Sequence, residues 1–219
     1  MADLDTGRME AIKNELGDSS RVLCFKCDVT KEEEVKAAMY KTKEAFGTIH
    51  VALASAGVIG WTPIISKNSV LNTKHFEKMF AINVFGSVYM AKYAAMIMRD
   101  NKPVNEEGER GLILFISSIA GEESQRGSEA YGATKAAVNG MTLPMARTLG
   151  KYNIRVATVA PGIFHTPIAK DHPAEVIQMM MKQTPMGRPG KAKEFAHFVQ
   201  AIVENPYING GHLRIDGAQ

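Results

Sequence analysis

A tyrosine and a lysine spaced for one face of a helix give the clearest chemical signal in the chain. Tyr131 and Lys135 lie in the run Tyr-Gly-Ala-Thr-Lys, and Ser118 precedes the tyrosine by thirteen residues. Side chains at positions i and i+4 share one side of a helix. A nearby cation favours the phenolate, so Lys135 is expected to lower the tyrosine pKa from its usual value of about 10. With a serine hydroxyl to hold a substrate oxygen, this trio predicts acid–base chemistry on an alcohol or a carbonyl.

The elements that must position this trio alternate along the chain. Apolar runs predict strands, and the longer amphipathic stretches between them predict helices over about 31–46, 73–99, 128–151 and 191–204. This alternation predicts one α/β domain over residues 1–219, with a Rossmann-like, doubly wound, mostly parallel sheet. The runs predicted as strands are Val22–Cys27, His50–Ala54, Leu112–Ser117, Arg155–Ala160 and His212–Ile215.

Three strands are followed by small or polar residues. These segments are Ala54–Gly57, Ser117–Ser118 and Pro161–Gly162. In an open parallel sheet, ligands bind beyond the carboxyl ends of the strands. The three segments are therefore expected to converge on one rim. Before the first long helix, Thr30 and Glu33 have the spacing of a capping box.

The composition describes an ordinary globular protein. A chain of 219 residues can bury one sizeable core but is short for two domains. The net charge is +3 with acids and bases intermixed, which argues against a nucleic-acid surface. No membrane span is expected, because Lys92 interrupts the most apolar stretch near Met90–Met98. The start, Met1–Asp5, is acidic and has the features of neither a signal nor a transit peptide.

The two cysteines form a Cys-x-x-Cys pair within a predicted strand. Three residues apart on a strand, Cys24 and Cys27 point to opposite faces. No second cysteine or histidine pair completes a set of metal ligands. Packed thiols in a reducing compartment are favoured over a redox or metal role, and no metal site is predicted.

Taken together, the motifs resemble those of the short-chain dehydrogenase/reductase family. Tyr-x-x-x-Lys alone is weak evidence, since an ordinary helix carries such pairs, but the joint set is specific and runs along nearly the whole chain. Stretches beginning at Gly140, Ala160 and Val199 resemble more narrowly the mitochondrial type-2 3-hydroxyacyl-CoA dehydrogenases, also described as hydroxysteroid dehydrogenases. The matching residues are Asp28-Val29, Ala54-Ser-Ala-Gly57, Asn83, Ser118, Tyr131, Lys135 and Pro161-Gly162.

The resemblance implies an NAD-dependent oxidoreductase that interconverts a secondary alcohol and a ketone. The substrate would be apolar, a 3-hydroxyacyl-CoA or a hydroxysteroid. Tyr131 would be the general acid–base, Ser118 would stabilise the developing oxyanion, and Lys135 would lower the tyrosine pKa and bind the cofactor ribose. Asn83 would contact Lys135 through water. The resemblance also implies a homotetramer and a mitochondrial location, with the cytoplasm as the alternative.

The resemblance further implies a set of NAD-binding residues. Asp3 would bind the adenosine ribose and favour NAD over NADP, and Asp28 and Val29 would touch the adenine. The small side chains around Ser55 and Gly57 would allow close approach of the cofactor. The residues that would hold the nicotinamide end and its ribose are Phe164, Thr166, Tyr131 and Lys135.

Several of these residues have plainer interpretations. Asn83 could be a solvent-facing or back-bonding helix residue. Asp28 could shape the turn before Thr30, a role compatible with adenine binding. Phe164 and Thr166 could simply belong to a turn between two prolines, and His165 could crowd the nicotinamide pocket or contact substrate. Around Met179-Met-Met, the segment Ile168–Met186 could be core packing or a lid over an apolar substrate.

One motif of the family has no counterpart in this sequence. The glycine-rich turn Gly-x-x-x-Gly-x-Gly is missing, and Met1–Asp5 corresponds to the tail of the family's second strand. Without the first strand, Val22–Cys27 is expected to lose its place beside His50–Ala54, leaving apolar sheet edges. Two functions therefore stay open: an active dehydrogenase, or a catalytically silent structural subunit or truncated form. The chain alone is expected to bind NAD weakly or not at all.

Overall fold

The computed structural model describes residues 1–17, 19–68, 70–166 and 181–219. The segment considered as a lid, Ile168–Met186, lies mostly outside the described residues. Short helical turns occupy Ser19–Arg21 and Ile119–Gly121. The other described elements follow in the order β1 (Ala2–Asp3), α1 (Thr6–Leu16), β2 (Phe25–Lys26), α2 (Glu32–Phe46), β3 (Val51–Ala54), α3 (Thr73–Phe80), a π-helical segment (Ala81–Phe85), α4 (Gly86–Met98), β4 (Gly111–Ile116), α5 (Glu129–Gly150), β5 (Ile154–Pro161), α7 (Ala192–Glu204) and β6 (His212–Ile215).

Four parallel strands form the main sheet, in the order β3-β4-β5-β6. Val51 pairs with Leu112, Gly111 with Ile154, and Thr158 with His212. Because the strands are parallel and in this register, their carboxyl ends lie along one rim. The predicted strands at the positions of β3 to β6 are confirmed to within a residue at each end.

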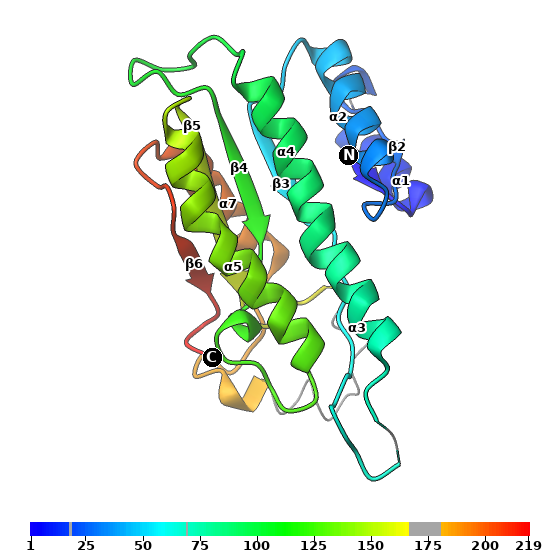
Figure 1. The fold of residues 1–219 in the computed structure, drawn as a ribbon. Helices are drawn as coiled ribbons and strands as arrows, with labels where there is room; N and C mark the ends of the chain where they lie inside the picture. The colour runs from blue at the N-terminus through cyan, green and yellow to red at the C-terminus, as the bar shows by residue number, and fades with distance from the viewer. Residues whose placement is uncertain (18, 69, 167–180) are drawn as a thin grey trace.

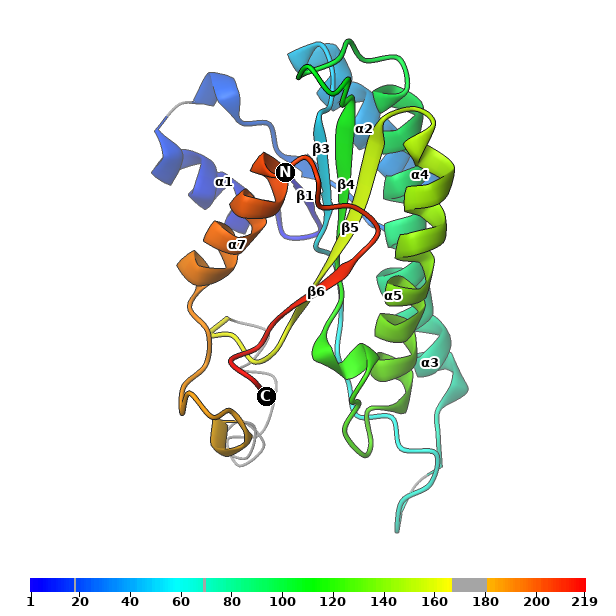
Figure 2. The ribbon, with the colours of Figure 1, turned by 90° about the vertical axis from the view of Figure 1, so that its left-hand side faces the viewer.

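Helices cover the main sheet on both faces, as Figure 2 shows. α2, α4 and α5 lie on one side of the strands, and α1 and α7 lie on the other. The predicted doubly wound α/β architecture is confirmed. The predicted long helices are also confirmed, although the polar, mostly exposed helix α1 was missed because only its Met9 is buried.

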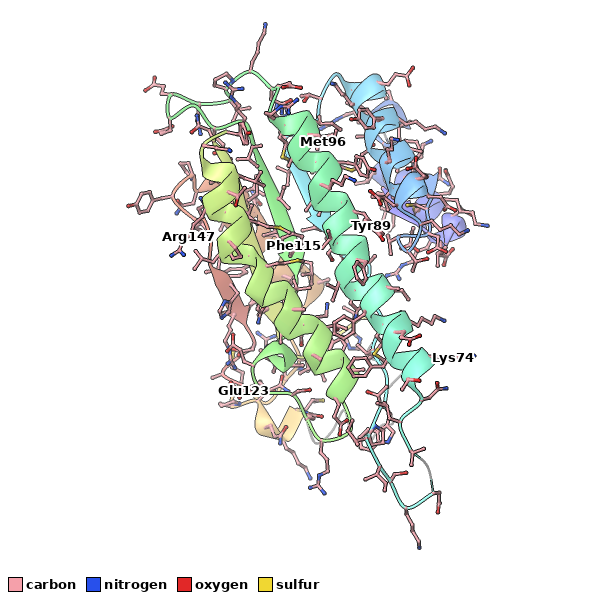
Figure 3. All side chains as sticks on the ribbon, in the orientation of Figure 1. Lys74, Tyr89, Met96, Phe115, Glu123 and Arg147 are labelled. Carbon is pink, nitrogen blue, oxygen red and sulfur yellow. The ribbon has the colours of Figure 1, made fainter. Side chains whose placement is uncertain are left out.

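The core explains why β4 and β5 are apolar at almost every position. On one face, Phe115 lies beneath α4 and α5 (Figure 3), in a buried cluster that also contains Ile97 and Val138. On the other face, Leu114 and Val159 contribute to the cluster around Ile202 of α7. Both strands are therefore shielded on both faces, as expected of central parallel strands.

The N-terminal strands form a separate small sheet. β2 pairs with β1 alone in a parallel two-stranded sheet, and the predicted strand Val22–Cys27 is reduced to Phe25–Lys26. On the outer edge of β3, the side chains of Val51 and Leu53 are 42% and 43% exposed. The expected separation of β2 from β3 is confirmed, and with it the apolar sheet edge.

The segment Thr73–Met98 forms one continuous helical run through α3, the π-helical segment and α4. By length and composition alone it could span a membrane, so the expectation that no stretch would be long and apolar enough was wrong. Its buried residues Ala94, Ile97 and Met98 pack on the sheet, however. This packing is that of a core helix, which satisfies the same length and composition test.

The predicted capping box before α2 is also wrong. Both the backbone N–H and the hydroxyl of Thr30 donate to the carboxylate of Asp28, at 3.0 and 2.7 Å. Glu34, rather than Glu33, accepts a hydrogen bond from the Asp28 backbone N–H at 2.8 Å. Lys31 is the N-cap residue of α2 and makes no side-chain cap bond. An aspartate two residues before a threonine competes for the donors that the capping box would have used.

Candidate active site

Ser118 lies where β4 leaves the sheet. It is the first residue of the turn that contains the short helix Ile119–Gly121, and its Oγ accepts a hydrogen bond from the Ala120 N–H at 3.2 Å. The same Oγ lies 3.5 Å from the carbonyl oxygen of Pro161, at the end of β5. The predicted meeting of these two strand ends is confirmed.

Two glycines allow this turn to press against α5. A Cβ atom on Gly121 would lie 2.9 Å from the carbonyl carbon of Lys135, and one on Gly132 would lie 3.1 Å from the Ala120 oxygen. Real Cβ atoms do not tolerate the first of these distances and rarely show the second. The lack of side chains at both positions therefore brings the Ser118 turn within reach of the first turns of α5.

Tyr131 occupies the first turn of α5, half-buried, with its phenol beside the Ser118 side chain. Burial raises the pKa of the Tyr131 phenol, and the Ser118 hydroxyl only partly opposes this effect. The expectation that Lys135 lowers the Tyr131 pKa is therefore not met in this structure. Removal of the phenol from water is the largest effect, and it outweighs the opposing effect of the Ser118 hydroxyl.

Lys135 is buried one turn further along α5. Its Nζ donates a hydrogen bond to the carbonyl oxygen of Ile116 at 2.8 Å and lies 5.7 Å from the centre of the Tyr131 ring. Burial lowers the pKa of Lys135 to about 8. Ser117 fixes the helix backbone at this point, because its hydroxyl donates to the Lys135 carbonyl oxygen at 3.0 Å. The amine therefore loses its proton at a pH closer to neutral than an exposed lysine does.

Asn83 is 1% exposed and lies in the π-helical segment Ala81–Phe85. Its side-chain amide accepts from the Val58 N–H and donates to the Val58 carbonyl, both at 2.9 Å, and donates to Thr134 Oγ1 at 3.0 Å. Thr134 in turn donates to the Tyr131 carbonyl at 2.7 Å. The solvent-facing interpretation is thus wrong: Asn83 joins the segment after β3 to α5. Single π-helical turns within α-helices often mark functional sites.

Gly57 completes the cluster at the end of β3. A Cβ atom placed on it would lie 3.4 Å from Asn83 Oδ1 and 3.7 Å from Lys135 Nζ. Ser55 is exposed two residues earlier on the same segment. The structure thus brings five of the predicted site residues together at one rim, namely Gly57, Asn83, Ser118, Tyr131 and Lys135.

The other predicted cofactor residues form two further groups, one in the N-terminal part of the chain and one just after β5. Asp3 is exposed at the end of β1, where its Oδ1 accepts from the Asp5 N–H at 3.0 Å. Val29 packs against Gly86 at the start of α4, where a Cβ atom would approach the Val29 Cβ to 2.9 Å. Asp28, bound to Thr30, has the turn-forming role that was one of its two interpretations, and these hydrogen bonds lower its pKa.

Beyond β5, the ring of Phe164 packs edge-on against Phe195 with 5.6 Å between ring centres. Its backbone forms an isolated bridge with Gly190. Thr166 is half-buried at the end of the described stretch, and His165 is exposed. The segment therefore has a definite packing partner in α7, beyond a simple turn.

Three residues that position the site were missed at the sequence level. Thr134, Val58 and Ser117 make the hydrogen bonds that hold Asn83 and α5. Thr134 could have been found from its position between Tyr131 and Lys135, one residue before the lysine. Val58 acts only through its backbone, which leaves no signal in residue type.

The cysteines lie away from this rim. Cys27 is 3% exposed in the cluster with Val35, Ala38 and Tyr93, and burial raises the pKa of its thiol. Cys24 is half-buried, and both thiols are free. The interpretation of Cys27 as a packed thiol is confirmed. Within the described residues no group of histidine, cysteine and acidic side chains could hold a metal.

The comparisons with known proteins show the family to which the chain belongs. The family model described as enoyl-(acyl carrier protein) reductase matches residues 1–218. 3-Hydroxyacyl-CoA dehydrogenase type-2 of Drosophila melanogaster is 40% identical over 223 residues, which cover 100% of this chain and 86% of that protein. The chain belongs to the short-chain dehydrogenase/reductase family. It is therefore an oxidoreductase by class, and the predicted family and fold are confirmed.

Other members of the family are similar over the same length. The human 3-hydroxyacyl-CoA dehydrogenase type-2 is 37% identical over 221 residues, covering 100% of this chain and 84% of the human protein. The crystal structure of 3-hydroxyacyl-CoA dehydrogenase type-2 from Mycobacterium avium superposes with a TM-score of 0.88 at 34% identity, covering 100% of this chain and 84% of that one. A 7α-hydroxysteroid dehydrogenase complexed with NADH and 7-oxo glycochenodeoxycholic acid gives 0.85 at 25% identity, covering 99% and 82%.

The buried amine of Lys135 predicts a pH-dependent stability. Its pKa is lowered from 10.5 to about 8, so the unfolded chain binds more protons than the folded chain between these values. The free energy of unfolding of the wild type should therefore rise with pH across this window relative to that of Lys135→Met. The relative gain should total roughly 3 kcal/mol, at about 1.4 kcal/mol for each unit of pKa shift.

Urea unfolding of both proteins at several pH values measures this difference. Lys151→Met, at an exposed lysine just after α5, is the control and should follow the wild type at every pH. Parallel curves for Lys135→Met and the wild type would contradict the prediction.

Proposed function

We propose that the chain catalyses the NAD-dependent interconversion of a secondary alcohol and a ketone on an apolar 3-hydroxyacyl-CoA or hydroxysteroid. The observation that carries this proposal is the placement of the Ser118 hydroxyl beside the Tyr131 phenol, with buried Lys135 behind them at the carboxyl ends of parallel strands. A phenol and a serine hydroxyl directed at one point suit the oxygen of a carbonyl or an alcohol.

The residues at this rim fit the nicotinamide-ribose end of the cofactor. The Lys135 ammonium has three N–H donors, and in the described chain one of them is bonded to the Ile116 carbonyl. The space beside it is bounded by Gly57, which has no side chain to fill it. The remaining donors suit ribose hydroxyls, and the bound nicotinamide would accept or supply the hydride.

In ketone reduction, Tyr131 would donate its phenolic proton to the substrate oxygen. Its raised pKa keeps it protonated near neutral pH, which suits an acid. Ser118 would donate its hydroxyl to the same oxygen as negative charge develops there. Turning toward the substrate would cost the hydroxyl only a weak hydrogen bond, because its contact with the Pro161 carbonyl oxygen is long at 3.5 Å. The Ala120 N–H meanwhile holds Ser118 Oγ in place.

Alcohol oxidation reverses the proton transfer and makes Tyr131 the base. Here a charged Lys135 would stabilise the phenolate, at the separation of 5.7 Å between the amine and the ring centre. The role proposed for Asn83, a water-linked contact with Lys135, stays a prediction. What supports it is the short space between them, which a Cβ atom at Gly57 would occupy.

The pyrophosphate end of the cofactor fits the described residues less well. The helix nearest in sequence to Asp3 is α1, and its N-terminus is already capped by the carboxylate of Asp5, which accepts from the Arg8 N–H at 3.1 Å. A second anion there would meet like charge instead of free N–H groups. Asp3, exposed at the end of β1, suits the two hydroxyls of an adenosine ribose and would repel a 2′-phosphate, which supports NAD over NADP.

Assembly into a homotetramer is proposed from the outer faces of α4 and α5. A shallow apolar groove of about 320 Å³ lies between these helices, lined by residues such as Ala91, Ala95 and Pro144. Phe85, just before α4, and Leu143 of α5 are 52% and 44% exposed. An apolar groove together with exposed aromatic and aliphatic side chains favours a covered surface. A mitochondrial role in lipid metabolism is proposed from the similarity to the type-2 dehydrogenases alone.

Replacing the acid–base residue should abolish most turnover. Tyr131→Phe should lower kcat/KM for 3-hydroxyacyl-CoA oxidation at saturating NAD by roughly 10²- to 10⁴-fold, because phenylalanine lacks the hydroxyl that would take up the substrate proton. The matched control is Tyr207→Phe, at a tyrosine 96% exposed, which should leave turnover unchanged. Initial rates of NADH formation at 340 nm measure both; equal rates for Tyr131→Phe and the wild type would exclude this role.

NAD affinity separates the active enzyme from the silent scaffold. Because α1 offers a capped N-terminus, calorimetric titration of the chain with NAD should show weak binding or none. Weak saturable binding with turnover at high NAD supports the dehydrogenase. No binding and no turnover would leave the structural subunit as the function, and tight binding would show that the pyrophosphate finds donors elsewhere.

Light scattering tests the proposed assembly. At micromolar concentration the chain should have the mass of a tetramer, and Leu143→Lys, which places a charge on the exposed face of α5, should shift it toward smaller species. A monomeric mass for the wild type would count against the proposal.

A further inference from the structure

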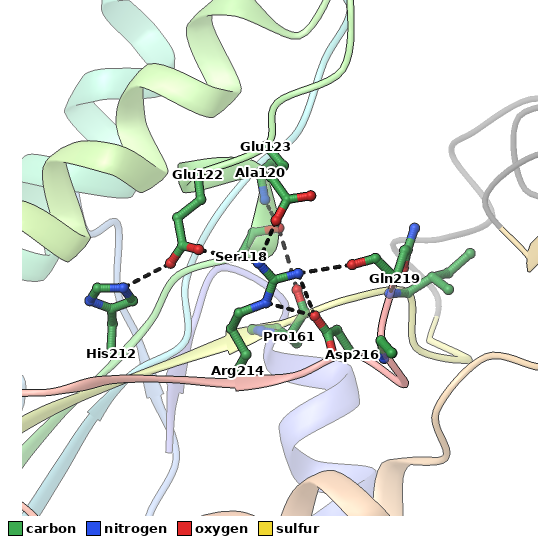
Figure 4. Close-up of polar contacts among 11 residues, drawn as sticks. Ser118, Ala120, Glu122, Glu123, Pro161, His212, Arg214, Asp216 and Gln219 are labelled. Atoms are coloured by element: carbon green, nitrogen blue, oxygen red, sulfur yellow. Dashed lines mark hydrogen bonds and ion pairs between the residues drawn. The ribbon is translucent and has the colours of Figure 1, made fainter. Parts of the chain in front are cut away.

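A charged cluster joins the Ser118 turn to the last strand. Arg214 of β6 donates from Nη1 to Glu122 at 3.2 Å and to Glu123, and both glutamates directly follow the short helix Ile119–Gly121. Glu122 Oε1 also lies 2.8 Å from His212 Nε2, at ion-pair distance, and Figure 4 shows both contacts to this one carboxylate. The turn that begins with Ser118 is thus attached to β6 by two side chains.

The same guanidinium binds the residues that follow β6. It donates from Nε to Asp216 Oδ2 at 2.7 Å and from Nη2 to the Gln219 carbonyl at 2.8 Å, and Nη2 also forms an ion pair with Asp216 Oδ2 at 2.6 Å. The side-chain oxygen of Gln219 accepts a hydrogen bond from the Ile163 N–H at 3.0 Å. Gly162 packs so closely on Asp216 that a Cβ atom there would lie 2.9 Å from the Asp216 Cα. Arg214 therefore contacts the Ser118 turn directly and reaches the Pro161–Ile163 segment through Asp216 and Gln219.

The balance of charge makes this cluster depend on its arginine. The acidic groups that face Arg214 are Glu122, Glu123 and Asp216, and the other cationic or titratable partner is His212. Without the guanidinium, three carboxylates would lie together with one imidazole among them. Their repulsion and the lost bonds would act first on the Ser118 turn, since a short 3-10 helix has few backbone bonds of its own.

We propose that Arg214 is a positioning residue: it fixes the Ser118 turn and the Pro161–Ile163 segment so that the Ser118 hydroxyl lies beside the Tyr131 phenol. Arg214 acts through these segments, and the structure shows no contact between it and the Tyr131 side chain. An arginine suits this task because its planar fork of five donors can bond several acceptors at once, whereas a lysine offers a point charge. This inference rests on the proposed function for its kinetic consequence but not for its structural one.

The kinetic test is a double-mutant cycle. Arg214→Met should lower kcat by about 10- to 100-fold with a smaller change in KM, whereas in a Ser118→Ala background it should cause little further loss, because both changes remove the same hydroxyl from its place. Arg214→Lys should restore part of the rate. The control Arg99→Met removes an exposed ion pair with Asp100 and should leave kcat unchanged in both backgrounds. If the two single losses of kcat multiplied in the double variant, Arg214 would act independently of Ser118. That result would show a merely structural role and overturn the proposal.

The structural test needs no turnover. In hydrogen exchange followed by NMR, the amides of Ala120, Gly121 and Glu122, which bond within the Ser118 turn, should exchange at least about 10-fold faster in Arg214→Met than in the wild type or Arg99→Met. The amides of β4 should keep their wild-type rates. Unchanged exchange in the turn would overturn the proposal.

Two outcomes keep the inference separate from the proposed function. An inactive wild type whose turn amides still depend on Arg214 would remove the dehydrogenase proposal and leave the positioning role. Should Arg214→Met fail to fold, Glu123→Gln weakens one of the ion pairs to Arg214, at a glutamate side chain that is 61% exposed. Exchange of the Ala120, Gly121 and Glu122 amides should then be faster than in the wild type, and unchanged exchange would overturn the proposal.

Discussion

The site depends on a buried amine that has to be placed with a hydrogen-bond acceptor. Lys135 is 6% exposed, and its ammonium meets the carbonyl of Ile116, the last residue of β4. Burying a charge is unfavourable unless it is paired or hydrogen-bonded, and the lowered pKa of Lys135 is the measure of that cost. To reach this carbonyl, α5 must cross the strand end closely. The position of Tyr131, one turn earlier on the same helix, follows from that crossing.

The close crossing is secured from both sides of α5. On the strand side, Ser117 bonds the helix backbone at Lys135, and Thr142 contacts Thr158 of β5 through hydroxyls 2.6 Å apart. On the side of the neighbouring helix, Asn83 bonds Thr134 and both backbone groups of Val58. Removing one partner from such a buried polar network leaves the other unsatisfied, so the network also specifies one arrangement of its segments. The placement of the candidate site residues therefore depends on the same buried hydrogen bonds that hold α5 against the sheet and the neighbouring helix.

The residues proposed for the two ends of the cofactor are held very differently. Those near the nicotinamide end, Gly57 and Lys135, belong to the four-stranded sheet and its helices, where the core is continuous. Asp3 belongs to the two-stranded sheet, whose strand β1 is exposed at both positions. Local stability follows buried contacts, so the adenosine end is expected to be the less well-ordered part of the site. This difference is the physical reason why the chemistry of the trio and the affinity for NAD are separate questions in this chain.

Sequence alone determined the elements whose signal is local. Apolar runs and helical spacing identified β3 to β6, the long helices and the meeting of three strand ends, because a parallel strand buried on both faces has to be apolar throughout. Residue type and spacing singled out Ser118, Tyr131 and Lys135 as candidates, and the family resemblance added Asn83. Sequence could not show α1, because the side chains of a mostly exposed helix carry little periodic pattern, and it favoured the wrong cap for α2, because two side chains competed for the same backbone donors.

Only the tertiary structure decided how the trio is tuned. The sign of the Tyr131 pKa shift depends on burial, which is set by the packing of α5 on the Ser118 turn rather than by the four-residue spacing to Lys135. The Arg214 cluster joins residues more than ninety positions away to the turn after β4, and no local pattern marks that contact. Spacing along one helix is a property of the sequence, whereas solvent exclusion and long-range charge pairing exist only once the strands have been brought together.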